Sequence, residues 1–291
     1  MSTQETLRLR LPEIVIKENQ GYKETELLKF LAGYPRVTQV MNADSLVFGK
    51  GDQIRFPSPV SPEEEKADPE LANRAFRRRV ALHTTSVGAT MNTMLDSLGV
   101  NKAIDLDETT VSSATQTMIL HDLKKLNEII WRPALGSSDA AYDAAEAHLA
   151  DLLRRAHYPE EYVQLAGSIG HNGARDYMTA PHLWPLVRQC AYLADDLHQE
   201  TIIQIDPLAK VRRLKTDPRY ADANAVGFPD RTNYPGFTKE DGSLTPKFDI
   251  QEQATIWMAD NVGRALGIRG RDLGKYLILQ ATDKGLYQPC A

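Results

Sequence analysis

The chain has 291 residues, of which 42% are hydrophobic and 25% are charged, as in an ordinary globular protein with a sizeable core. Its formal net charge of −5 excludes a surface that is basic all over. A basic groove on an acidic body stays possible, because charges are screened over about 8 Å at physiological salt. No run approaches the ~20 apolar residues that cross a bilayer, and the start of the chain shows no apolar signal segment. We therefore expect an intracellular protein with no membrane partner.

The first part of the chain combines strand-like and helix-like patterns. Leucines alternate with arginines at the start of Leu7–Ile16, and this period of two predicts a strand. A short helix is predicted at Glu24–Leu31, and a second β-like piece at Arg36–Phe56. The proline-rich acidic stretch Pro57–Pro69 then marks a boundary. We interpret residues 1–60 as a small β-containing region or arm.

The stretch Pro69–Val100 predicts one long amphipathic helix that organises the rest of the chain. Apolar side chains recur with heptad spacing along it, the pattern of a helix packed lengthwise against other helices. The residues of this seam are Val80, Thr84, Val87, Met91, Met94 and Leu98.

The remainder of the chain reads as a succession of helices with one irregular interruption. Helices are predicted at Asp107–Trp131, Asp139–His157, Glu160–Ile169, Leu186–Glu200, Asp249–Leu266 and Asp272–Thr282. The predicted fold is mainly α: a helical core over 61–205, an irregular segment over 206–248 and a C-terminal helical region over 249–291, with extended arms. The irregular segment is rich in Pro, Gly, Asp and Tyr, and such long connections are typically functional.

Basic side chains form two clusters that could contact phosphates. The first comprises Arg74, Arg77, Arg78 and Arg79; the second comprises Arg212, Arg213 and Lys215. Guanidinium groups match phosphate oxygens bidentately, and arginines interleaved with aromatic residues are typical of proteins that bind single-stranded nucleic acid. The alternative for the first cluster is local pairing with the acidic run Glu63–Glu70.

No stretch carries a specific catalytic or metal-binding motif, so no catalytic residue, metal or cofactor is predicted. The glycine-rich stretch Gly167–Tyr177 is the most enzyme-like, because it offers His171 beside a possible anion cradle. Its Arg175 is also a candidate nucleic-acid contact. The glycine series Gly263–Gly274 lacks the GK[ST] ending of a phosphate-binding loop.

The remaining histidines show no paired metal-ligand spacing. Asp195 and Asp196, which lie close to His198 in the sequence, are interpreted as part of a solvated helix face.

A strand-forming arm, a helical core, arginine clusters and no catalytic motif together resemble, at the level of architecture, the nucleocapsid or coat proteins of helical RNA viruses. The resemblance implies a non-enzymatic structural protein that polymerises into a virion, with its N-terminal arm on the neighbouring subunit. It also implies that arginines bind the backbone of single-stranded RNA. Two alternatives stay open: an enzyme that acts on a small anionic substrate at Gly167–Tyr177, and a scaffold that assembles without nucleic acid.

Overall fold

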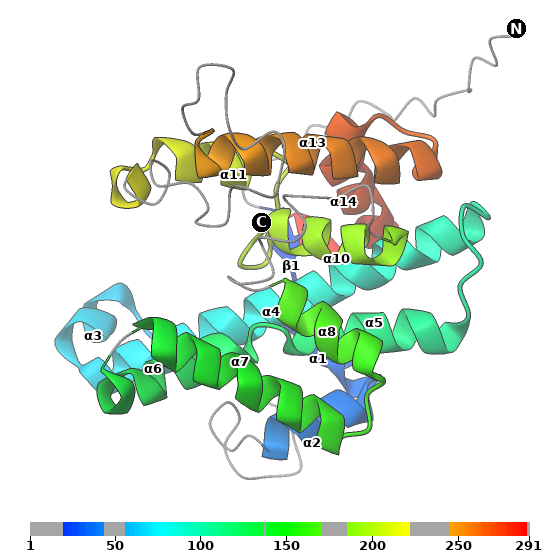
Figure 1. Ribbon diagram of the computed structural model, residues 1–291. Coiled ribbons are helices and arrows are strands. Elements are labelled where there is room, and N and C mark those ends of the chain that lie inside the picture. The colour runs from blue at the N-terminus through cyan, green and yellow to red at the C-terminus, as the bar shows by residue number, and fades with distance from the viewer. Residues whose placement is uncertain (1–19, 44–55, 137, 170–184, 222–244, 290–291) are drawn as a thin grey trace, which may run out of the picture.

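The computed structural model describes residues 20–43, 56–136, 138–169, 185–221 and 245–289 (Figure 1). Within these residues the fold is mainly α, as predicted, with twelve α-helices and two small antiparallel sheets. The helices are α1 (Glu24–Ala32), α2 (Pro35–Ala43), α3 (Pro62–Ala67), α4 (Pro69–Val100), α5 (Glu108–Leu120), α6 (Leu123–Leu135), α7 (Ser138–Arg155), α8 (Glu160–Ser168), α10 (Leu186–Asp196), α11 (Ala209–Thr216), α13 (Lys247–Leu266) and α14 (Leu273–Asp283).

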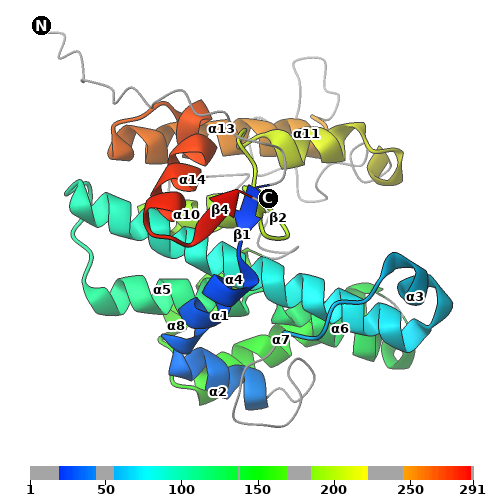
Figure 2. The same ribbon diagram turned by 180° about the vertical axis from the view of Figure 1, so that it is seen from behind.

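Helix α4 crosses the middle of the molecule, as Figures 1 and 2 show, with α10 and α13 on one side and α5 to α8 on the other. It begins where the Asp68 carboxylate accepts a hydrogen bond from the Glu70 amide at 2.8 Å, with Pro69 in the first turn. All six residues of the predicted seam are buried, which confirms this helix as a core element. Gly88 lets α5 approach closely, because a Cβ there would collide with the Ile119 side chain.

The two ends of the described chain meet in one sheet. Strand β1 (Gln20–Tyr22) pairs antiparallel with β4 (Tyr287–Pro289), and Tyr22 lies opposite Tyr287. The second sheet is a hairpin of β2 (His198–Gln199) and β3 (Ile202–Ile203), which directly follows α10. Closing the chain on itself in this way fixes the start of α1 against the C-terminal helices.

Three sequence-based predictions of secondary structure are wrong. The β-like piece at Arg36–Phe56 begins as helix α2, in which Val37, Val40 and Met41 are buried at helical spacing; residues 44–55 lie outside the described residues. The predicted irregular segment contains α11 and a short 3₁₀-helix at Pro218–Tyr220.

The third wrong prediction is the single helix at Asp107–Trp131. It is two helices, α5 and α6, separated at His121 and Asp122. The predicted strand at Leu7–Ile16 lies outside the described residues.

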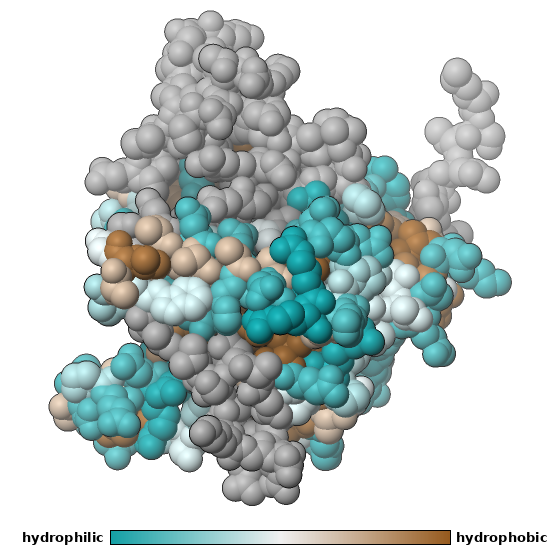
Figure 3. Space-filling view, turned by 60° about the horizontal axis from the view of Figure 1, so that its bottom comes forward, coloured by the Kyte–Doolittle hydropathy of each residue, from teal (hydrophilic) through white to brown (hydrophobic). Residues whose placement is uncertain are grey.

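Buried apolar side chains from every described part of the chain form one contiguous core cluster. On the face shown in Figure 3, hydrophilic side chains cover most of the described surface and apolar ones show only in small patches. Among the described residues, no helix is long and apolar enough to cross a membrane. Cys190 is fully buried, and burial raises the pKa of its thiol to about 12.

Candidate metal-binding site

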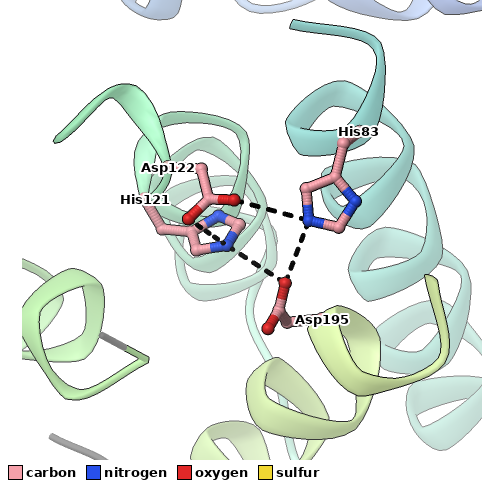
Figure 4. Close-up of side chains that lie close together, drawn as sticks. All are labelled: His83, His121, Asp122 and Asp195. Carbon is pink, nitrogen blue, oxygen red and sulfur yellow. Dashed lines mark hydrogen bonds and ion pairs between the residues drawn. The ribbon is translucent and has the colours of Figure 1, made fainter. Parts of the chain in front are cut away.

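Four ionisable side chains from three places in the chain converge beside the middle of α4. His83 comes from α4, His121 and Asp122 from the junction of α5 and α6, and Asp195 from α10 (Figure 4). One ligand atom from each of these four residues, here called the His–Asp cluster, lies within 4.8 Å of every other.

The junction of α5 and α6 brings two adjacent residues, His121 and Asp122, into the same cluster. Adjacent residues on a continuous helix point about 100° apart, so a break is needed to bring both to one point. His121 ends α5, and Asp122 has φ −95° and ψ 2°, outside the helical region. The Asp122 carboxylate does not cap α6; it is directed at the histidines instead.

The contacts within the cluster are short, and His83 Nε2, His121 Nε2 and Asp195 Oδ1 each take part in two of them. His83 Nε2 lies 3.0 Å from Asp195 Oδ1 and 3.4 Å from Asp122 Oδ2. His121 Nε2 lies 3.4 Å from Asp122 Oδ1 and 3.5 Å from Asp195 Oδ1. Ligands held at about 2.0–2.2 Å from one metal ion lie about 3 to 3.6 Å apart in tetrahedral or octahedral geometry, which these separations match.

The orientation of His121 is fixed by a contact on its far side. Its Nδ1 lies 2.6 Å from the carbonyl oxygen of Met118, so Nδ1–H donates to that carbonyl and Nε2 is the nitrogen that faces the cluster. This is the outer hydrogen bond that metal-binding histidines commonly make. His121 Nε2 is buried and makes no hydrogen bond, although it points at the centre of the cluster. Its nearest partners are the carboxylates of Asp122 and Asp195, at ion-pair distances of 3.4 and 3.5 Å. A metal ion would bind Nε2 in its unprotonated form.

The cluster is closed on one side and open on the other. The side chains of His121 and Asp122 are 1% and 3% exposed, whereas those of His83 and Asp195 are 16% and 14% exposed. If the four side chains held an octahedral ion, two of its positions would be open to water or substrate. A catalytic metal site needs such an open position, and a purely structural site does not.

Two lysines offset the negative charge of the cluster. Lys210 Nζ lies 2.9 Å from Asp195 and 3.4 Å from Asp196, and Lys125 Nζ lies 2.5 Å from Asp122. Burial would raise the pKa of Asp122, but the charges of His121, Lys125 and His83 outweigh it and hold this pKa below its ordinary value.

The pKa of Asp195 is likewise held well below its ordinary value. Burial opposes this shift, and the charge of Lys210 and the contacts from His83 and His121 outweigh burial. Both carboxylates are therefore ionised at neutral pH, which is the form that binds a metal ion.

The prediction that Asp195 and Asp196 lie on a solvated face is wrong. Asp196 is only 1% exposed, and burial raises the pKa of its carboxyl group. It accepts a hydrogen bond from the Thr255 hydroxyl on α13 at 3.2 Å. The aspartates face the interior because α10 packs against both α4 and α13.

The first basic cluster is mostly engaged with carboxylates or backbone. Arg78 contacts Glu24 and donates to the Pro57 carbonyl at 2.6 Å, and Arg79 contacts Glu65 through both nitrogens at 3.0 and 2.8 Å. The pairing of Arg79 with Glu65 is the local pairing with the acidic run that the sequence offered as the alternative to phosphate binding. The Nε of Arg74 is buried without a hydrogen-bond partner among the described residues, and the Nε of Arg77 lies 3.4 Å from the Asn73 carbonyl oxygen.

The second basic cluster lies on α11, far from the first in the sequence. Arg212 pairs with Asp206 at 2.5 Å, Lys215 pairs with Glu252 at 3.0 Å, and Arg213 is exposed. Among the described residues, no hydrogen bond or ion pair joins its arginines to those of α4. Arg175 and most of the Gly167–Tyr177 loop lie outside the described residues.

The sequence contained one usable signal for the His–Asp cluster, namely polar residues in strongly apolar surroundings. His121 and Asp122 follow the run Met118–Leu120, and Asp195 follows Leu193 and Ala194. No protein-family model, curated protein or solved structure matches this chain, so the cluster is interpreted from its own geometry.

Proposed function

We propose that this protein binds a divalent metal ion at the His–Asp cluster and uses it to hydrolyse a phosphate ester. The observation that carries the proposal is the convergence of ligand atoms: the buried His121 Nε2, which makes no hydrogen bond, faces two ionised carboxylates and a second imidazole, with one atom of each residue within 4.8 Å of every other. Two imidazoles with two carboxylates suit a first-row transition metal, since imidazole favours Zn, Fe and Ni while carboxylates add Mn.

The charge balance supports an anionic substrate. A metal ion binds neutral imidazole, so in the metal-bound site the carboxylates of Asp122, Asp195 and Asp196 would be opposed by Lys125 and Lys210. A divalent cation adds two positive charges to this balance and leaves the site slightly positive. Such a site attracts a phosphate group and stabilises the charge that develops on it during reaction.

The reaction consistent with this site is attack of a water oxygen on phosphorus. A new P–O bond forms, the P–O bond to the alcohol breaks, and the alcohol oxygen takes a proton that the water releases. A zinc ion held there would lower the pKa of a water bound to it to about 7. The protein's own groups hold the geometry: the histidines and aspartates fix the position of the ion, and Lys210 holds Asp195 in place while adding positive charge.

The test combines metal content with hydrolysis. Protein stripped with a chelator and dialysed is titrated with Mn²⁺, Zn²⁺ or Co²⁺ by calorimetry, and hydrolysis of p-nitrophenyl phosphate is then measured. We expect one ion per chain, activity that requires it, and loss of both in His121→Gln and Asp195→Asn. A matched control is His157→Asn, since His157 is exposed and has φ +61°, which Asn tolerates.

Two results would contradict the proposal in different ways. Absence of metal binding would show that the cluster is only an ion-pair network. Binding without hydrolysis of any phosphate mono- or diester would show that the ion has a structural role.

The prediction of a self-assembling, RNA-binding coat protein stays a prediction. We do not base the proposal on it, because Arg78 and Arg79 already contact carboxylates within this chain.

A further inference from the structure

The glycine series of the C-terminal region brings three backbone segments into contact. A Cβ on Gly263 of α13 would lie 2.9 Å from the Gly270 amide nitrogen, and one on Gly270 would lie 2.6 Å from the Asp260 amide nitrogen. A Cβ on Gly274 of α14 would lie 2.5 Å from the Ile205 carbonyl oxygen. Only glycine permits such approaches, so the series serves to pack α13, the turn after it and the loop before α11 together.

These three segments enclose a groove of about 1060 Å³ on the surface. Figure 2 shows α11, α13 and α14 grouped at one end of the molecule. The charged residues that line the groove are Arg212, Arg264, Arg269, Arg271, Lys275, Asp206, Asp260 and Asp272.

Three cations of the groove are not neutralised by ion pairs. Arg212 pairs with Asp206 at 2.5 Å, and Arg269 pairs with Asp272 at 2.6 Å. The exposed side chains of Arg264, Arg271 and Lys275 make no ion pair or hydrogen bond with the described residues, and of the lining acids only Asp260 is left to oppose them. The groove is therefore a local positive region on an acidic chain.

A second depression, of about 370 Å³, continues the groove along α13. The two share Ile256, Asp260 and Arg264, and the second adds Trp257, which is 38% exposed. Trp257 and Arg264 are seven residues apart, so they lie on one face of α13 and about 10 Å apart along its axis. The joined surface thus presents an indole beside a row of cations.

The groove is separate from the His–Asp cluster. On α11, Lys210 contacts Asp195 of the cluster, whereas Arg212 lines the groove. Two residues correspond to a turn of about 200° around a helix, so the two sites lie on opposite sides of α11.

We propose that the joined groove binds a segment of single-stranded nucleic acid. The cations of Arg264, Arg271 and Lys275 contact successive phosphates, and a base stacks on Trp257. Sequence-independent binding of single strands uses this combination of a basic track and an aromatic platform. Two connected depressions suit an extended ligand, and the indole favours a base over an acidic peptide side chain.

The test is fluorescence anisotropy of a labelled 12-nucleotide single-stranded RNA, with the full chain and with chelator present, so that it does not depend on metal or activity. We expect the triple variant Arg264→Ala, Arg271→Ala, Lys275→Ala to lower the slope of log affinity against log salt by about 2 units, at about 0.7 per phosphate contact. Trp257→Ala weakens binding at least about 5-fold, and Trp257→Phe restores most of it.

The matched control removes the same charge from another surface: Arg132→Ala, Arg154→Ala, Arg155→Ala. Binding with an unchanged salt slope in this control supports the groove. Equal loss in both triple variants would overturn the proposal, as would no binding by the unaltered chain. Competition by polyglutamate as effective as competition by unlabelled RNA would assign the groove to an acidic peptide instead.

Discussion

Substitution of Asp122 by Asn tests the His–Asp cluster through stability rather than catalysis. Asn keeps the shape of the side chain and removes the negative charge that lies near both histidines. A ligand that binds only the folded state at 100 times its Kd stabilises it by about 2.7 kcal/mol. Scaling the entropy of unfolding to 291 residues gives about 0.6 kcal/mol per degree, so we expect Tm to rise by about 4 °C.

The assay is a thermal melt of the metal-free protein at increasing concentrations of Mn²⁺ or Zn²⁺, with the Kd taken from calorimetry. Each further tenfold excess adds about 1.4 kcal/mol, or about 2 °C, to the unaltered protein. Asp122→Asn should show no rise over the same range, and His157→Asn should follow the unaltered protein. An equal rise in Asp122→Asn would refute the cluster as the binding site.

Two further predictions concern stability alone. Burial and the charge of His83 lower the pKa of His198 to about 3, so the unfolded chain binds one more proton between pH 3 and 6.5 and stability falls as pH drops through that window. The contribution of this residue to the free energy of unfolding, measured by urea titration, should fall by up to about 1.4 kcal/mol per pH unit, and His198→Gln should make the fall smaller. An unchanged dependence of stability on pH in His198→Gln would contradict the assignment. Arg78→Ala removes a side chain that is 15% exposed and contacts Glu24 and the Pro57 carbonyl, and it should cost about 1–3 kcal/mol in urea denaturation, whereas Arg155→Ala, which removes an exposed ion pair, should cost under about 1 kcal/mol. Equal costs for the two would show that the Arg78 contact is solvated.

The fold was largely predictable where the spacing of hydrophobic residues along the sequence agrees with how the helices pack. The seam in Pro69–Val100 recurs over the whole helix, so its burial followed from spacing alone. The β-like interpretation of Arg36–Phe56 failed because Val37 and Val40 have high strand propensity, while tertiary packing selects the helix that Pro35 begins.

The site was not predictable from local patterns. Its ligands come from α4, the α5–α6 junction and α10, separated by tens of residues, and only packing brings them together. The break at His121 left no trace in the periodicity, because apolar residues continue on both sides of it. The sequence has no metal-binding motif of fixed spacing, because two of the ligands are adjacent and the positions of the other two depend on how the helices cross.

The break at His121 and Asp122 is best understood as a local cost that the site requires. A continuous helix from Glu108 to Leu135 would keep every backbone hydrogen bond and would point the two side chains in different directions. Instead the chain interrupts the helix and buries an imidazole and a carboxylate, and it leaves His121 Nε2 without a hydrogen bond. Departures of this kind from local rules concentrate at functional sites, because folding stability alone would remove them. A cation at the cluster offsets that cost directly, which is why we place the proposed hydrolytic function at this junction rather than at the arginines of α4.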